Sequence, residues 1–304
     1  MDIRDALFDQ IYDFAERDKD VVFITADTDA FSLHKFKEDF PDRFINVGVA
    51  EQAMVTVAAG LALSGKKVFI YAIIPFITMR VFEQIKATIC SMNLPVTIIG
   101  AGAGLSFGYD GPTHHAIQDI GIMRMLPEMQ IYNPFDAYTA ADCALSSYHS
   151  GKPSYIRLDK GEYPNREYHL QDGICTDINN KNNRADIAII CTGTIYHTIK
   201  EIIPAFPKHV YLFNVLRLKP LTIDRLLGSL YNMSTILVFE ENSRTGGLGT
   251  MLKETLIDKT QMTLKHYSLE DEQIFKYGTR EYLLKKNSLD KESIYNILKE
   301  ETGS

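Results

Sequence analysis

The chain begins with apolar residues at helical spacing and continues with an almost fully apolar run. Leu7, Ile11 and Phe14 recur as they would on one face of a helix. The run from Val21 to Ala26 is typical of a strand that is buried on both faces. The same alternation continues, and further strands are expected at Phe44 to Val47, Val68 to Ile74, Val96 to Gly100, Gln130 to Tyr132 and Tyr155 to Leu158. A mostly parallel sheet covered by helices on both faces is predicted.

A second unit of the same kind follows a polar interruption. Apolar periodicity fades between Gly161 and Arg184, and this stretch ends in a cluster of asparagines, Asn179, Asn180, Asn182 and Asn183. Strands are expected again at Ile187 to Cys191, Val210 to Val215, Ile236 to Phe239 and Leu264 to Tyr267, with a closing helix near Ser288 to Glu300. We therefore predict two doubly wound α/β domains, residues 1–165 and a smaller one at 185–304, joined by a linker at 166–184.

Composition narrows the class of protein. The chain is 45% hydrophobic and 23% charged with a formal net charge of -7, so a nucleic-acid partner is not expected. The cysteines, Cys90, Cys143, Cys175 and Cys191, lack metal-site spacing and favour buried free thiols in a reducing cytoplasm. The apolar run from Val68 to Ile77 is too short to span a bilayer. We expect a soluble cytoplasmic protein with no membrane partner.

Two glycine-containing stretches imitate nucleotide-binding motifs but lack their essential residues. Gly60 to Lys67 resembles a phosphate-binding loop, yet Lys67 stands where a serine or threonine would ligate magnesium, and the stretch leads from a helix into a strand. Counted from Gly102, the third glycine of a dinucleotide fingerprint is replaced by Phe107. A simpler interpretation of the small residues at this strand end is that they allow another backbone segment or a ligand to approach closely.

Candidate chemistry begins at the segment Asn46-Val-Gly-Val-Ala-Glu-Gln52. It places Glu51 and Gln52 just after a predicted strand, at the start of a helix of small residues that runs to Ser64. Ligands of open α/β sheets gather at such strand ends. A structural alternative is that Glu51 stabilises the first turn of its helix through the helix dipole.

A second candidate segment, Asp110-Gly-Pro-Thr-His-His115, follows the glycine-rich strand end. It brings one carboxylate and two imidazoles onto a loop between a strand and a helix. Isolated histidines on loops are commonly just exposed polar residues. Two adjacent histidines behind an Asp-Gly-Pro turn instead favour a site.

These segments, taken with others, resemble the transketolase family. Its pyrimidine-binding domain is matched by Gly48-Val-Ala-Glu-Gln52, Ala58-Ala-Gly-Leu-Ala62, Phe76 to Gln84 and Asp110 to His115. Its carboxy-terminal domain is matched by Glu240-Glu-Asn-Ser, Gly246-Gly-Leu-Gly249 and the stretch from Phe275-x-x-Gly-Thr to Leu289-Asp-Lys-Glu-Ser293. The resemblance therefore spans nearly the whole chain.

The resemblance also implies what must come from elsewhere. Transketolases hold the diphosphate and magnesium of thiamine diphosphate on a domain with a Gly-Asp-Gly motif and a downstream asparagine, and this sequence has no such motif. A separate diphosphate-binding subunit is expected, with two copies of each chain, and self-association through both domains of this one. The spacing from Phe76 through Arg80 to Gln84 is closer to split transketolases than to 1-deoxyxylulose 5-phosphate synthases.

The family's cofactor site assigns roles to residues of this chain. The glutamate matching Glu51 hydrogen-bonds a pyrimidine nitrogen of thiamine diphosphate and so promotes formation of the reactive ylid, and the cofactor carries the carbanion chemistry. Phe76 matches the aromatic residue that stacks on the pyrimidine ring, although core packing is its structural alternative. Gln52 and Arg80 lie in the same two motifs and are expected to help bind the cofactor. No metal ligand is expected from this chain.

The family's substrate site is matched in part. His114 matches a histidine that contacts the reacting carbonyl or hydroxyl of the sugar, and Asp110 a carboxylate that senses hydroxyl configuration. Arg4 occupies the position of a phosphate-binding arginine of the family. Lys160 occupies the position of a second such arginine, and a lysine there keeps the positive charge but cannot make the two parallel hydrogen bonds of a guanidinium. Two further positions depart from the family. Gly102 replaces a substrate-binding histidine, and Phe31 approximately replaces a serine.

The expected activity is transfer of a two-carbon ketol unit from a ketose donor to an aldose acceptor, with a sugar or sugar phosphate as substrate. This chain should be active only with its diphosphate-binding partner. One alternative is ketol synthesis that begins with decarboxylation of a 2-oxo acid, as in 1-deoxyxylulose 5-phosphate synthesis. Another is a regulatory subunit that keeps the fold without catalysis.

Overall fold

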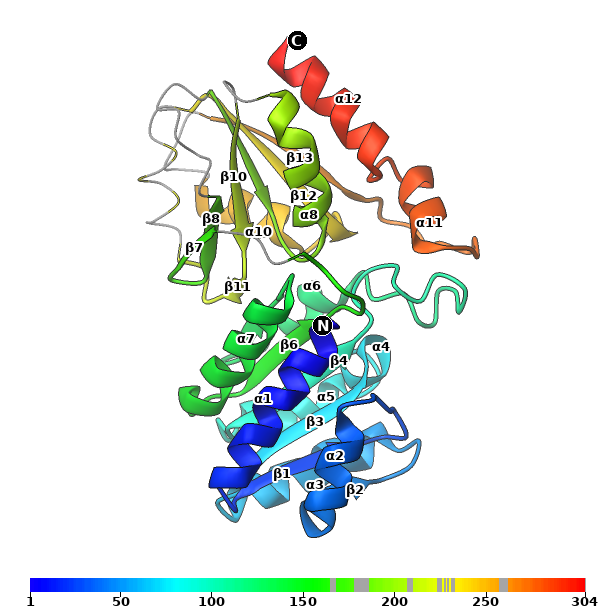
Figure 1. The fold of residues 1–304 in the computed structure, drawn as a ribbon, viewed down its shortest axis with the longest axis vertical. Coiled ribbons are helices and arrows are strands. Elements are labelled where there is room, and N and C mark those ends of the chain that lie inside the picture. Colours follow the sequence, from blue (N-terminus) through cyan, green and yellow to red (C-terminus); the bar gives the residue numbers. More distant parts are fainter. Residues whose placement is uncertain are drawn as a thin grey trace.

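The chain folds around two β-sheets, the first built mainly from the first half of the sequence and the second from the second half (Figure 1). The computed structural model describes residues 1–164, 168–177, 186–206, 210–222, 226, 228, 230, 233–256 and 262–303. The predicted class, two mostly parallel doubly wound α/β units, is confirmed. All the strands predicted from the sequence are present, three of them with the predicted bounds: Gln130–Tyr132, Ile187–Cys191 and Val210–Val215.

The first sheet has seven strands in the order β11-β5-β6-β4-β3-β1-β2, and all neighbours are parallel except β11 and β5. Its non-sequential order means that helical crossovers connect the parallel strands. The strands are β1 (Val21–Thr25), β2 (Phe44–Asn46), β3 (Lys67–Ile73), β4 (Val96–Ala101), β5 (Gln130–Tyr132), β6 (Ser154–Leu158) and β11 (Arg217–Lys219).

Helices cover both faces of the first sheet because successive residues of its strands point to opposite sides. Phe23 of β1 joins a core cluster with Leu7 of α1 (Ile3–Arg17), whereas the next residue, Ile24, joins another with Val55 of α3 (Glu51–Leu63). The remaining α-helices of this half are α2 (Leu33–Asp39), α4 (Ile74–Ile77), α5 (Phe82–Gln84), α6 (Asp119–Met123) and α7 (Ala137–Ser150); a 3-10 helix, η1 (Pro41–Arg43), and a π-helix, η2 (Ile85–Cys90), complete the described helices of this half.

The second sheet has six strands in the order β13-β12-β9-β10-β8-β7. The four strands from β13 to β10 are parallel, and β8 and β7 extend them antiparallel. The strands are β7 (Tyr168–Gln171), β8 (Ile174–Asp177), β9 (Ile187–Cys191), β10 (Val210–Val215), β12 (Thr235–Ser243) and β13 (Thr263–Leu269). The helices that the structure describes here are α8 (Ile195–Ile202), α10 (Leu248–Leu256), α11 (Arg280–Lys286) and α12 (Lys291–Thr302), with a 3-10 helix, η3 (Ile203–Ala205), directly after α8.

The expected linker is partly a β-hairpin. Tyr168 to Asp177 form β7 and β8, which pair with each other and add to the second sheet through β10. Asp172 and Gly173, both at positive φ, make the turn between them. Residues 165–167 and 178–185 lie outside the described residues, and with them the four asparagines. The domain limits at 165 and 185 and the linker between them stay predictions, and the hairpin shows that Tyr168 to Asp177 within that stretch have regular structure.

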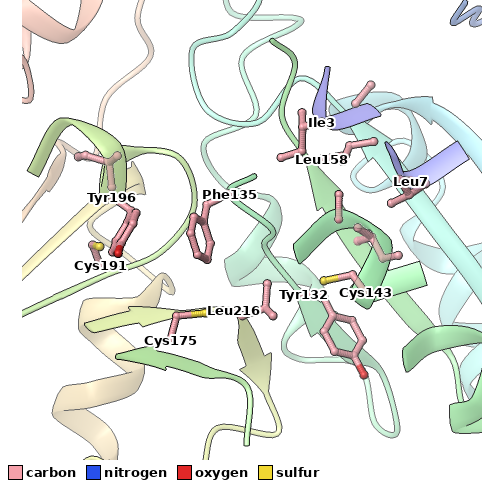
Figure 2. Packing of buried hydrophobic residues seen from close by; sticks show 14 of the residues in the cluster. Ile3, Leu7, Tyr132, Phe135, Cys143, Leu158, Cys175, Cys191, Tyr196 and Leu216 are labelled. Carbon is pink, nitrogen blue, oxygen red and sulfur yellow. The ribbon is translucent and has the colours of Figure 1, made fainter. Parts of the chain in front are cut away.

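The two halves share structure at their junction. β11 follows β10 in the second half of the sequence but pairs antiparallel with β5 in the first sheet. Phe135, just after β5, packs against Tyr196 of α8 with ring centroids 4.8 Å apart. Figure 2 shows Phe135 between Tyr196 and Cys175 of the second half and Cys143 of the first. A continuous apolar core therefore crosses the junction.

The four cysteines are free and buried, as the sequence predicts. Burial raises the pKa of Cys90 to about 11, so its thiol stays protonated and unreactive near neutral pH. Among the described helices, none combines the length and the apolar character needed to cross a bilayer.

Candidate functional site

Glu51 is a buried carboxylate at the first turn of α3. Asn46 ends β2, and its side-chain oxygen accepts the backbone N–H groups of Gly48 at 2.9 Å and of Asp27 at 3.1 Å, which ties the carboxyl ends of β1 and β2 together. Gly48 has a φ of +70°, a conformation that glycine adopts without strain. The chain then turns into α3, and Glu51 is 4% exposed. A buried carboxylate needs a partner.

Arg80 supplies that partner and also stacks on an aromatic ring. Its Nη1 donates to Oε2 of Glu51 at 2.9 Å, while its guanidinium carbon lies 4.0 Å from the ring centroid of Phe76. Phe76 is half-buried on α4, directly after β3. The planar cation is thus held between a carboxylate and a ring face, an arrangement that arginine favours.

The loop that carries His114 contacts the same aromatic ring, Phe76. The His114 ring lies 5.0 Å from the Phe76 ring at an angle of 72°, and 6.1 Å from the Phe107 ring. Thr113 Oγ1 lies 3.0 Å from Nδ1 of His114 and orients the imidazole. Nζ of Lys160 lies 4.3 Å from the centroid of the Phe107 ring.

Phe107 explains why position 102 is a glycine. A Cβ atom at Gly102 would lie 2.0 Å from a ring carbon of Phe107, far inside contact distance, and Gly102 has a φ of +86°. The ring of Phe107 therefore occupies the space that a side chain at position 102 would need. Where the family pattern has a polar histidine, this chain has an aromatic surface beside His114.

Arg4 lies near the end of β6, beside the segment that carries Lys160. Its Nε and Nη2 donate to the two oxygens of Asp2, each at 3.1 Å, and these hydrogen bonds raise the pKa of Arg4. Asp2 also accepts the backbone N–H of Gly161 at 3.0 Å. Both cations that the sequence assigns to phosphate binding are therefore engaged within the chain, Arg4 by a carboxylate and Lys160 by a ring.

A continuous series of contacts joins most of the predicted site. It runs from Glu51 through Arg80, Phe76 and His114 to Phe107 and Lys160. Other predicted residues stand apart. Within the described parts of the chain, the exposed side chains of Asp110 and Gln52 make no hydrogen bond or ion pair, and Phe31 is 83% exposed.

Several residues that shape the site receive no separate role from the sequence. Phe107 stands out in the sequence only as the residue in place of a third glycine, and His115 only as one of two adjacent histidines. His115, next to His114, is buried, and this burial lowers its pKa, so its imidazole is neutral near pH 7. From the second half of the chain, Glu241 contacts the same loop, since its Oε1 accepts the backbone N–H of Leu105 at 2.6 Å. The described residues contain no group of three or more His, Cys, Asp or Glu side chains that could hold a metal ion.

A known protein family matches the half of the chain that carries this site. The family model of the transketolase pyrimidine-binding domain matches residues 1–166, more than half of the chain. The chain belongs to the transketolase family. The match includes β1 to β6 and every residue of the contact series described above.

Relatives of this transketolase-family chain extend the likeness to its second half. One of the subunits of apulose-4-phosphate transketolase from Actinobacillus succinogenes is 32% identical, over 91% of this chain and 91% of that protein. The 1-deoxy-D-xylulose-5-phosphate synthase of Oleidesulfovibrio alaskensis is 31% identical over 95% of this chain but 46% of its own length. A solved structure described as a split gene transketolase, an inactive β4 tetramer, superposes with a TM-score of 0.86 at 27% identity, covering 99% of this chain and 98% of that one.

Proposed function

We propose that this chain is the pyrimidine-side subunit of a split, thiamine diphosphate-dependent transketolase that moves a two-carbon ketol unit from a ketose to an aldose. The observation that carries the proposal is the trio of Glu51, Phe76 and Arg80. In it, a flat nitrogen-bearing group stacks on Phe76 and donates a hydrogen bond to Glu51. An aminopyrimidine ring is also flat and nitrogen-bearing, and its ring nitrogen can share a proton with Glu51: it accepts from the protonated carboxyl group or, once protonated, donates to the carboxylate.

The residues present fit that cofactor. Arg80 is 42% exposed in its side chain, so it can leave the Phe76 face without disturbing the core, and Glu51 stays buried behind it. A pyrimidine ring in place of the guanidinium would keep both the stack and the hydrogen bond to Glu51. When bound, thiamine diphosphate supplies the carbanion chemistry of ketol transfer.

The chain's own residues then have distinct tasks. Glu51 would hold a proton between its carboxyl oxygen and the ring nitrogen, and its burial limits the access of water to that proton. Thr113 orients His114, leaving Nε2 of the imidazole to exchange a proton with a substrate oxygen. Asp110, exposed on the same loop, is available to bind sugar hydroxyl groups.

The acceptor end supports a sugar or sugar phosphate with an apolar face. Phe107 offers its ring beside His114, and C–H groups of a sugar pack well on aromatic faces. Arg4 and Lys160 would bind a phosphate group by exchanging their present partners, Asp2 and Phe107. The relative named for apulose 4-phosphate supports a phosphorylated substrate.

We further propose that a separate subunit holds the diphosphate and magnesium, in an α2β2 assembly in which this chain also self-associates through both its domains. Support comes from one relative that is named as a single subunit of a transketolase and from another described as an inactive β4 tetramer. The buried free thiols support a cytoplasmic location.

The test is reconstitution with the diphosphate-binding chain, recognised by its Gly-Asp-Gly motif and downstream asparagine, in the presence of thiamine diphosphate and magnesium. This chain alone should be inactive. In the mixture, Glu51→Gln should lower kcat by about 10²- to 10⁴-fold, because the proton at the ring nitrogen is lost. Glu83→Gln, an exposed carboxylate on α5, is the matched control. Wild-type turnover by Glu51→Gln would refute the role of Glu51.

A second candidate is ketol synthesis from a 2-oxo acid, favoured by the 31% identity to 1-deoxy-D-xylulose-5-phosphate synthase. Release of carbon dioxide from pyruvate by the same mixture would support it over ketol transfer. If the mixed subunits bind no cofactor at all, a regulatory role is favoured instead.

A further inference from the structure

The loop from Gly102 to His115 is attached to the second half of the chain along most of its length. It connects β4 to α6 and carries Phe107, Asp110 and His114. Figure 1 shows it running from the first sheet toward the foot of α11. Residues of β12, α11 and the segment before α11 contact it at successive positions.

Glu241 of β12 makes the central contact. Its Oε1 accepts the N–H of Leu105 at 2.6 Å, two residues before Phe107, and Leu105 is fully buried. Arg280, at the start of α11, fixes the carboxylate from the other side, with Nε 3.1 Å from both oxygens and Nη2 2.7 Å from Oε2. Gly104 leaves room for this carboxylate, since a Cβ there would lie 2.4 Å from Oε1.

Asp159, which follows β6, joins the same ion cluster. Arg280 Nη2 donates to its Oδ2 at 2.8 Å, and the hydroxyl groups of Ser106 and Thr194 donate at 2.5 and 2.6 Å. Burial alone would raise the pKa of Asp159, but Arg280 and the two hydroxyl donors more than offset it, so the pKa lies below its usual range. Ser106 is therefore held by a carboxylate that is charged at neutral pH.

The outer part of the loop is held by backbone contacts. Gly278 N–H donates to the carbonyl of Gly108 at 3.3 Å. A Cβ on Gly108 would meet the carbonyl oxygen of Gly278 at 2.5 Å, and one on Gly111 would meet the Tyr277 ring at 2.4 Å. The two segments thus pack against each other at distances that only glycine permits at these loop positions.

We propose that Glu241, fixed by Arg280, is a positioning residue: it holds the loop of Phe107, Asp110 and His114 at the substrate end of the cofactor site. This proposal rests on the proposed function. It gives the second domain a direct task in the reaction, because the catalytic histidine of the first domain is aligned by side chains that belong to the second. Small displacements of such a group are costly to catalysis.

The first measurement is amide hydrogen exchange of the whole chain. Glu241→Leu removes the acceptor for Leu105 N–H and should speed exchange across residues 102–115, while exchange in β1 and β3 stays as in the wild type. Glu241→Gln keeps a carbonyl oxygen for Leu105 and should have a smaller effect. Lys285→Ala, on α11 with a side chain 70% exposed, is the matched control and should leave the loop unchanged.

The second measurement is kinetics of the reconstituted complex, per cofactor-loaded site. Glu241→Leu should lower kcat by about 10- to 100-fold with the affinity for thiamine diphosphate unchanged, because Glu51 and Phe76 lie on other elements. Glu241→Gln should recover part of that loss. If Glu241→Leu does not fold, hydrogen exchange and kinetics are both measured on Glu241→Gln and Arg280→Lys instead.

Unchanged loop exchange, or unchanged kcat per loaded site, would overturn the positioning role. A contribution to folding alone would reduce the yield of loaded complex and leave kcat per site as in the wild type. If the wild-type complex transfers no ketol unit, the proposed function fails, and hydrogen exchange in the chain alone still decides whether Glu241 holds the loop.

Discussion

Arg80 keeps a buried carboxylate paired in the cofactor-free chain. Glu51 is 4% exposed and accepts from Arg80 at 2.9 Å. An ionised carboxylate in such a place costs free energy when its donor is removed. The same residue therefore has two roles in our proposal, as the partner of Glu51 before the cofactor binds and as a side chain that must move when it does.

Removing this donor should destabilise the chain alone. Arg80→Leu is expected to lower the free energy of unfolding by about 1–3 kcal/mol, since Glu51 is left without its charged partner. Urea denaturation of the cofactor-free chain measures this. In the double variant Glu51→Gln/Arg80→Leu the buried charge is gone, so most of the loss should be recovered. Equal stability losses in the single and double variants would contradict the pairing.

Phe107 and Gly102 form a second coupled pair. Gly102→Ala should lower the free energy of unfolding by about 1–3 kcal/mol, because its Cβ would overlap the Phe107 ring and because a φ of +86° strains alanine. Adding Phe107→Val should recover the steric part of this loss and leave the backbone part. Urea denaturation of the two variants separates the two contributions. Without any recovery, the ring does not occupy that space.

At the residue scale, the sequence predicts contacts within motifs better than contacts between them. Glu51, Phe76, Arg80 and His114 lie in short conspicuous segments, and the structure brings them into one series of contacts. Phe107 could have been found from the pattern, since a large ring five residues after Gly102, on the same loop, can fill the space that the family histidine would occupy. Glu241 is different. Its contact with Leu105 spans 136 residues and leaves no local signal.

At the scale of elements, buried parallel strands were predictable because their apolar runs are continuous. Shorter elements were not. β7 and β8 have four residues each, in a segment rich in turn formers, and neither contains a continuous apolar run. β11 has three residues and belongs by sequence to the second half, yet it pairs with β5 of the first sheet. The helix α11 was also missed, as its seven residues bury mainly Leu283.

The loop between β4 and α6 should make stability depend on pH through His115. Burial lowers the pKa of its imidazole below the ordinary 6.5, so the unfolded chain binds a proton more readily than the folded one. Stability is therefore lost as the pH falls below about 6.5. Between pH 7.5 and 5.5, urea denaturation should show a larger loss for the wild type than for His115→Gln. His34→Gln, at an exposed site, should lose as much stability between these pH values as the wild type. The same dependence of the free energy of unfolding on pH in all three proteins would contradict the effect of His115 burial.

At the scale of the molecule, the two sheets are joined by more than a linker. β11 extends the first sheet from within the second half of the sequence, and the Phe135 contact with Tyr196 continues the apolar core across the junction. The ion cluster of Asp159, Glu241 and Arg280 adds charged groups from both halves. Interfaces of this kind, apolar and strand-sharing, oppose independent motion of domains.

The whole chain should consequently unfold in one transition, although it contains two sheets. Calorimetry at pH 7 is expected to give one peak whose calorimetric and van't Hoff enthalpies agree. Asp159→Asn removes the carboxylate through which the first half binds Arg280. Glu241 belongs to the second half, so its remaining ion pair with Arg280 does not link the halves, and the variant should show two peaks. Glu270→Gln breaks an exposed ion pair with Arg244 within the second half and should leave one peak, at nearly the wild-type temperature. Two peaks in the wild type would mean that the halves fold independently, and one peak in Asp159→Asn would assign the coupling to β11 and the apolar core alone.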